Sequence, residues 1–302
     1  MNVEALIDTE SSPDLAAAAA VFAESRRRLF GIAYRMLGSV ADAEDVVQDV
    51  WIRWQSTDRD GIVEPAAFLA TITTRLCINA LQSARVRRET YIGPWLPEPV
   101  NTEDDPSLGA ERAEALEFAM LMLLEKLTPT ERAAYVLREA LEYPYERIAE
   151  IVQTSVVSAR QLVSRARRHL AGERRTPAPR AEQRRLLEAF LGAAQRGDVT
   201  TLETLFAADV VSYTDGNGAK LAARTPVSGR ARVAQFVAAF SSHFWTGKTV
   251  DWVEVNGQPA ATLSEGGLVR TVVTLTASPE GIQNLLWIMS PDKLHHVAPV
   301  GA

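Results

Sequence analysis

A predicted helix from about Val156 to Leu170 has the side chains best suited to recognise another molecule. Its core-facing residues fall within an arc of about 100°: Ala159, Leu162, Val163, Ala166 and Leu170. The opposite face presents Ser158, Gln161, Ser164, Arg165 and Arg168. Gln and Arg can form paired hydrogen bonds with base edges, and Arg also neutralises phosphate. This face therefore indicates a nucleic-acid contact, although a solvated basic face has the same composition.

The residues before this helix favour the nucleic-acid interpretation. Thr128 is a predicted N-cap, with Pro129 in the first helical turn and Glu131 three residues after the cap. A short helix is then expected over Pro144–Ile151 and a tight turn over Gln153–Ser155. A short helix, a turn and a basic helix make up a helix-turn-helix, whose last helix enters the major groove.

An acidic surface is predicted on an earlier helix, which has four acids and no base between Val40 and Val50. Three of the acids lie within an arc of about 60° beside the apolar stripe: Asp42, Asp45 and Asp49. By contrast, the stretch from Arg160 to Arg185 holds nine arginines and two acids, in a chain of net charge −6. Charge segregated in this way indicates at least two macromolecular contacts, although the acidic face could equally be a solvated one.

Composition excludes several classes of protein. The 302 residues are 47% apolar and 23% charged, which fits two or three packed domains and excludes wholesale disorder. The single cysteine, Cys77, and the scattered histidines predict neither a disulfide nor a metal site. No apolar run is long enough to span a membrane, and the charges around Leu15–Ala23 are in the wrong order for a secretory signal. We therefore expect a cytoplasmic protein without a cofactor.

Two loop-like stretches divide the chain. Four prolines between Tyr91 and Gly109 predict a semi-rigid linker over residues 93–109, and Gly172–Pro179 forms a second break. The predicted domains are therefore residues 20–92, 110–172 and 180–302. The first two have helical periodicity, including a helix over about Ala66–Arg88.

The third block mixes helical and strand patterns. Amphipathic segments predict three helices: Leu186–Ala194, Thr200–Ala207 and Val233–Phe240. Segments rich in Val, Ile, Leu and Thr predict strands: Val250–Val255, Leu268–Leu275 and Ile282–Met289, the last two joined by a hairpin turn at Ala277–Gly281. The expected fold is thus mainly α in the N-terminal two-thirds, followed by an α+β domain.

Two runs, Leu29–Gly38 and Ala41–Trp51, resemble region two of bacterial extracytoplasmic-function sigma factors. The block that ends in the helix-turn-helix resembles their region four. The third block is similar to the SnoaL-like cone appended to one branch of this family. That branch has a Trp-Leu-Pro-Glu-Pro linker, which is present here as Trp95–Pro99.

Two further loops support the similarity to this branch. Asp215–Lys220 corresponds to an Asp-Gly-Gly-Gly-Lys loop with imperfect glycines, and Ser290–Leu294 corresponds to Asn-Pro-Asp-Lys-Leu. The resemblance implies an interdomain regulatory contact made by the linker and these loops. The candidate residues are Trp95, Pro97, Asp215, Gly216, Gly218, Lys220, Pro291, Asp292 and Lys293.

The resemblance also implies partners. The Asp42, Asp45 and Asp49 face would bind core RNA polymerase, and the helix-turn-helix would bind promoter DNA. The loop Ser56–Pro65 and the helix after it would recognise the minus-ten element. Its candidate contacts are Arg75, Asn79, Gln82, Arg85, Arg87 and Arg88.

Two other functions remain open at this point. The chain could be a conventional helix-turn-helix regulator with a ligand-sensing domain, although such a regulator needs no acidic helix. It could also be an isomerase or cyclase with an accessory DNA-binding part. Its candidate carboxylates are then Asp209, Asp215, Asp251 and Glu254. A sigma factor whose third block regulates activity without catalysis is the favoured hypothesis, and an unknown small ligand of that block is compatible with it.

Overall fold

The computed structural model describes residues 13–89, 91–102, 118–171, 175–219, 221–295 and 297. The first unit packs three helices together: α1 (Pro13–Leu37), α2 (Val40–Gln55) and α3 (Pro65–Glu89). Gly38 ends α1 with a φ of +67°, and the Ser39 side chain accepts a hydrogen bond from the Asp42 amide to begin α2. The predicted apolar stripe of α2 is confirmed, since Val46, Val47 and Val50 are buried.

The second unit is the predicted helix-turn-helix. It consists of α5 (Phe118–Leu124), α6 (Pro129–Glu139), α7 (Tyr145–Ile151) and α8 (Val156–Ala171). The capping box between Thr128 and Glu131 is present in full. All five residues predicted for the core face of α8 are buried. Local capping and periodicity therefore account for this unit.

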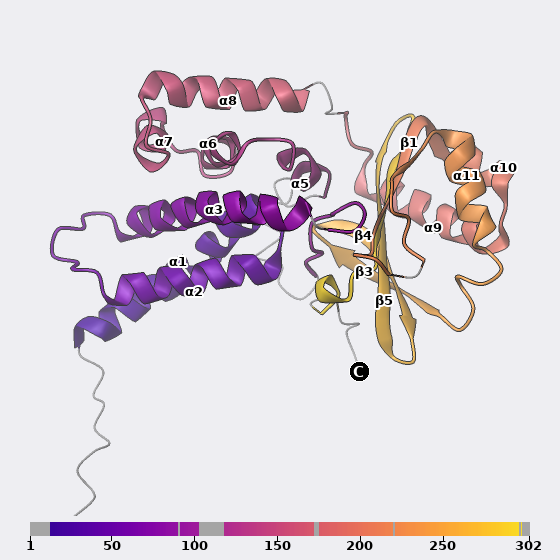
Figure 1. The fold of residues 1–302 in the computed structure, drawn as a ribbon, viewed down its shortest axis with the longest axis horizontal. Coiled ribbons are helices and arrows are strands. Elements are labelled where there is room, and N and C mark those ends of the chain that lie inside the picture. The colour runs from indigo at the N-terminus through magenta and orange to yellow at the C-terminus, as the bar shows by residue number, and fades with distance from the viewer. Residues whose placement is uncertain are drawn as a thin grey trace, which may run out of the picture.

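The C-terminal unit is a six-stranded sheet in the order β2-β1-β6-β5-β4-β3. The strands are β1 (Phe206–Asp215), β2 (Val227–Ser228), β3 (Thr249–Val255), β4 (Gln258–Glu265), β5 (Leu268–Ser278) and β6 (Gly281–Ile288). Strand β1 runs parallel to β6, and the other pairs are antiparallel. Three helices pack on one face of this sheet (Figure 1): α9 (Arg180–Arg196), α10 (Val199–Leu205) and α11 (Arg230–Ala239).

The sequence prediction for this unit was incomplete. The hairpin between β5 and β6 is confirmed, since Ser278 pairs with Gly281. The helix predicted over Thr200–Ala207 is wrong at its end, because the chain enters β1 at Phe206. Neither β1 nor β4 was predicted. In β4, Pro259 and two alanines replace the usual β-branched residues, and burial on both faces suits small side chains there.

The segment predicted as a semi-rigid spacer is instead packed between the units. The described residues 91–102, which include its first part, contain no helix, and Leu96, Pro97, Glu98 and Pro99 are buried. Residues 91–102 are called the linker below. Leu96 belongs to a hydrophobic cluster on the sheet face opposite α9–α11, together with Phe118 of α5 and Leu286 of β6. The helical units share one continuous core, and α6 packs against α1 and α3. The linker therefore joins all three units into one body (Figure 1).

Among the residues that the structure describes, no helix is long and apolar enough to cross a bilayer. The same residues contain no cluster of potential ligands that could hold a metal ion.

Candidate nucleic-acid interface and interdomain contacts

The outer face of α8 presents the residues predicted to contact DNA. Gln161, Arg165 and Arg168 are exposed, whereas Ser158 is half-buried and its hydroxyl lies 2.9 Å from Ser155 Oγ at the helix start. Arg165 Nε lies 3.4 Å from Oε1 of the capping residue Glu131. The Arg165 side chain is 49% exposed, whereas that of Glu131 is 9% exposed and also accepts hydrogen bonds from Thr128. The solvent side of the Arg165 guanidinium is therefore accessible to a phosphate or a base.

The face of α3 is partly covered by the helix-turn-helix. Arg75 Nε donates to the Ile151 carbonyl at 3.1 Å, and its Nη2 donates to the Glu150 carbonyl at 2.9 Å. Asn79 and Gln82 are exposed. The side chains of the other three candidates, Arg85, Arg87 and Arg88, lie outside the described residues. Arg75 thus binds the carboxyl end of α7, where helix carbonyls attract cations.

A second arginine holds the two helical units together. The Arg132 side chain is 3% exposed, and its Nη1 donates at 2.7 Å both to the Met36 carbonyl and to Glu125. Met36 lies in the last turn of α1, so this bond attaches α6 to the end of α1. The acidic face of α2 points elsewhere, since Asp45 and Asp49 are exposed and Asp42 is half-buried.

The centre of the interdomain contact is a buried carboxylate. Asp215, the last residue of β1, is 0% exposed. It accepts hydrogen bonds from the Leu96 amide at 2.6 Å, from Lys293 Nζ at 2.6 Å and from the Tyr91 hydroxyl. A buried charge needs several such partners. Burial, followed by the hydrogen bond to Asp215, raises the pKa of Tyr91 above its ordinary value.

Lys293 and Trp95 extend this contact toward the first helical unit. Lys293 Nζ also donates to the Leu96 carbonyl, and it lies 4.1 Å from the centre of the Trp95 ring. The edge of the six-membered ring of Trp95 lies against Gly38, where a Cβ atom would be 2.8 Å from Trp95 Cη2. Gly38 is therefore required both by its positive φ and by this close approach. We call Tyr91, Trp95, Leu96, Asp215 and Lys293 the linker clamp.

A second set of contacts joins the linker to the first helices. The Glu98 amide donates to the Gly38 carbonyl at 2.8 Å, and its carboxylate accepts from the Val40 amide at 2.8 Å. Tyr34 donates to the Glu98 carbonyl at 2.6 Å and accepts from Asn256 Nδ2 at 2.7 Å. Asn256 Oδ1 accepts from the Val100 amide. Burial raises the pKa of Tyr34 above its ordinary value, which keeps the hydroxyl protonated as a donor.

The remaining predicted interdomain residues occupy varied positions. Pro97 is buried, and a Cβ at Gly216 would clash with the Ala222 methyl. Gly218 lies against Ile92 of the linker. Pro291 and Asp292 are exposed, and Lys220 lies outside the described residues. Asp215 itself, which the sequence suggested was part of a glycine-rich loop, is instead the buried end of a strand.

Sequence reasoning missed several of these residues: Tyr34, Tyr91, Glu98, Arg132 and Asn256. The Asn256-Gly257 pair between β3 and β4 is a hairpin turn signal that could have been recognised. No local signal distinguishes the others, because their partners lie far away in the sequence.

The interior of the C-terminal cone is a packed core. The Trp287 ring lies 5.6 Å from Phe244 and 5.8 Å from Phe190, measured between ring centres. A void of only about 30 Å³ remains beside these rings. Its lining contains none of the four candidate carboxylates. Asp209 and Asp251 are exposed, and Arg175 lowers the pKa of Asp209 through an ion pair.

Comparisons with known proteins agree with this architecture. Residues 21–87 match the family model of Sigma-70 region 2, and residues 117–170 match Sigma-70, region 4. The chain is 38% identical over 234 residues to the ECF RNA polymerase sigma factor SigJ of Mycobacterium tuberculosis, an alignment that covers 75% of this chain and 74% of the relative. It is 29% identical over 273 residues to the probable ECF sigma factor SigI, covering 89% and 92%.

A solved structure extends the similarity to the whole chain. The crystal structure of Mycobacterium tuberculosis SigJ superposes with a TM-score of 0.74 at 32% identity, and covers 94% of this chain and 100% of that one. The chain therefore belongs to the extracytoplasmic-function family of RNA polymerase sigma factors. The predicted fold class, with helical sigma units and a C-terminal SnoaL-like domain, is confirmed. The protein directs promoter recognition and transcription initiation, so the conventional-regulator hypothesis is wrong.

Proposed function

We propose that the C-terminal domain regulates this sigma factor by holding the two helical units in a closed arrangement through the linker clamp. The observation that supports this most strongly is the fully buried Asp215, whose partners come from the linker and from the segment after β6. A carboxylate buried in this way is stable only while all of these segments stay together.

The closed arrangement limits access to DNA. Arg75 of α3 is occupied by the carboxyl end of α7, so the surface for the minus-ten element and the helix-turn-helix contact each other. Binding two separated promoter elements requires these units to move apart. Because the regulatory domain is part of the same chain, its effective concentration is high and even weak contacts are sufficient.

The partners we infer are core RNA polymerase and promoter DNA. The exposed Asp45 and Asp49 suit a basic surface on the polymerase, and their position beside a buried stripe lets them act without disturbing the fold. Gln161, Arg165 and Arg168 of α8 suit the upstream promoter element.

The C-terminal domain regulates, in this proposal, without catalysis. Its aromatic interior leaves little room for a substrate, and the candidate carboxylates Asp209 and Asp251 are solvent-exposed. General acid–base chemistry would need such a group within hydrogen-bonding reach of a bound substrate.

Run-off transcription with core polymerase tests the proposal. Asp215→Asn should raise promoter output at limiting sigma factor, because it weakens the clamp and frees α3. Asp209→Asn is the matched control, since it makes the same chemical change at an exposed position of the same domain. Equal output from both variants and the wild type would contradict the regulatory role.

A further inference from the structure

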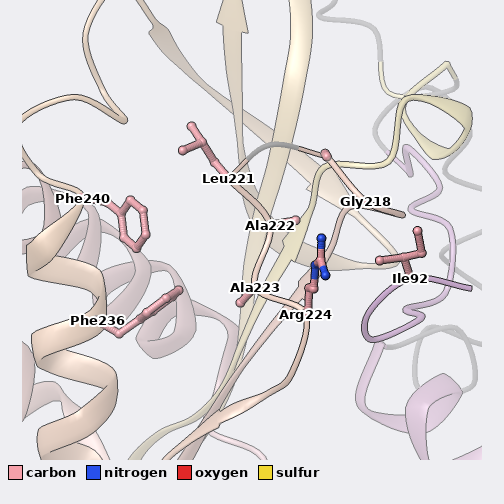
Figure 2. Close-up of a pocket in the computed structure, with 9 residues that line it drawn as sticks. Ile92, Gly218, Leu221, Ala222, Ala223, Arg224, Phe236 and Phe240 are labelled. Carbon is pink, nitrogen blue, oxygen red and sulfur yellow. The ribbon is translucent and has the colours of Figure 1, made fainter.

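A second cavity, of about 320 Å³, opens at the mouth of the cone. It lies between α11 and the loop that follows β1 (Figure 2). Phe236 and Phe240 form one wall, Leu221 and Arg224 belong to the loop, and Ile92 of the linker lies on the far side. This volume is at the lower end of the range for small-molecule sites, which begins at about 300 Å³.

Apolar side chains converge on this cavity while remaining accessible. Ile92 is 49% exposed and Leu221 is 42% exposed, and both are among the few large apolar residues left exposed in the described part of the chain. Phe236 and Phe240 meet edge to face, with ring centres 5.1 Å apart. Isolated exposed apolar residues are ordinary, but two exposed and two half-buried apolar side chains from three separate segments around one hollow are typical of a site for an aromatic ring.

Among the lining residues that the structure describes, Arg224 supplies the charge. It is exposed, and no ion pair or hydrogen bond of its guanidinium is found within the part of the chain that the structure describes. A guanidinium binds a carboxylate through two parallel hydrogen bonds. The lining thus combines an aromatic wall with an anion-binding group.

We propose that this cavity binds a small aromatic carboxylate, with its ring against Phe236, Phe240 and Leu221 and its carboxylate on Arg224. The size of the ligand is limited from two sides. Toward the cone interior, beyond Phe236 and Phe240, a void of only about 30 Å³ remains, and on the linker side Ile92 lies against Gly218. These limits favour a small molecule over an extended peptide.

The position of Ile92 couples the cavity to the linker clamp. Ile92 follows Tyr91, which donates to Asp215. A ligand that packs against Ile92 makes this contact only while the linker is bound to the C-terminal domain. Ligand binding therefore stabilises the closed arrangement by mass action. This second part rests on the proposed regulatory function, whereas the binding site itself does not.

Titration of the full chain with 1-naphthoate, followed by calorimetry, tests the site. We expect saturable binding that weakens about tenfold in Arg224→Gln, as expected for loss of a charge-assisted hydrogen bond. The matched control Arg230→Gln replaces another exposed arginine at the start of α11 and should leave the affinity unchanged. Uncharged 1-naphthalenemethanol should bind wild type and Arg224→Gln equally.

Two results would overturn the site: no saturable binding of 1-naphthoate at millimolar concentration, or equal affinity in wild type and Arg224→Gln. Coupling is measured separately by run-off transcription, where saturating 1-naphthoate should lower output from the wild type and not from Arg224→Gln. Binding without a change in output would refute the coupling alone. If 1-naphthoate did not bind but Asp215→Asn still raised promoter output, the site would be refuted and the proposed regulation would remain supported.

Discussion

Replacing Asp215 with Asn perturbs the linker clamp at its most buried group. Asn has the same shape, but it is neutral and places an NH₂ where one carboxylate oxygen accepted a hydrogen bond. The side chain of Lys293 is 10% exposed, so its ammonium would lose its charged partner while it kept contacts such as the Leu96 carbonyl and the Trp95 and Tyr91 rings. Removing one partner of a buried ion pair costs about 3–5 kcal/mol. Because these other contacts of Lys293 survive, we expect a loss at the low end of that range, about 3 kcal/mol.

Urea unfolding of the full chain, followed by tryptophan fluorescence, measures this loss. The clamp joins the domains, so its weakening should also separate the transition of the C-terminal domain from that of the helical units. Asp209→Asn breaks only an exposed pair with Arg175 and should change the free energy of unfolding by less than about 1 kcal/mol.

A change below about 0.5 kcal/mol in Asp215→Asn, which is typical of surface substitutions, would refute this reasoning. Lys293→Met provides a second approach, since it removes the cation and leaves Asp215 with its linker donors. If Lys293→Met raised promoter output while Asp215→Asn did not, the buried charge pair would not be the element that controls closure.

Three further predictions concern the DNA, polymerase and pH responses. Charge reversal of Asp45 and Asp49 together should weaken binding to core polymerase, and the effect should be stronger at low salt. Helicity measured by circular dichroism should be unchanged. An affinity equal to wild type would exclude this contact. Arg165→Ala should cost about 1–3 kcal/mol in binding to the preferred promoter sequence and should relax specificity. Arg167→Ala removes an exposed pair with Glu139 and should weaken binding to all sequences alike. The opposite result would show that the wrong face of α8 was assigned. The raised pKa of Tyr91 means that the folded chain favours the protonated phenol, so its contribution to stability is complete below the ordinary tyrosine pKa of about 10 and is lost as pH rises above it. Tyr91→Phe should therefore flatten the fall in unfolding free energy above that pH, and identical profiles would contradict the role of Tyr91.

The sequence by itself determined the helical units and their function. The helix-turn-helix follows from local signals. These are the Thr128 cap, the hydrogen bond that the Thr128 amide donates to the Glu131 side chain, and the apolar spacing of α8. Such signals act within a few residues, so they survive in any environment that permits a helix. The acidic face of α2 was predictable for the same reason, since helical periodicity fixes which residues share a face.

Strands β1 and β4 were not predictable in this way. The exposure of β1 alternates only in part, because Ala208 and Asp209 near its start are both exposed at an irregularity in the pairing with β6. In β4 the alanines are suited to a strand covered on both faces, and strand propensity reflects packing against neighbours more than the backbone.

Only the tertiary structure decided what the linker does. Its prolines predicted a stiff spacer, but Leu96 is buried against the sheet and its amide binds Asp215, 119 residues away. The hydrogen bond between Tyr34 and Asn256 spans 222 residues. Periodicity indicates which side chains turn inward, but it does not indicate which distant segment covers them. The closed arrangement therefore depends on long-range partners that no local pattern in the sequence specifies.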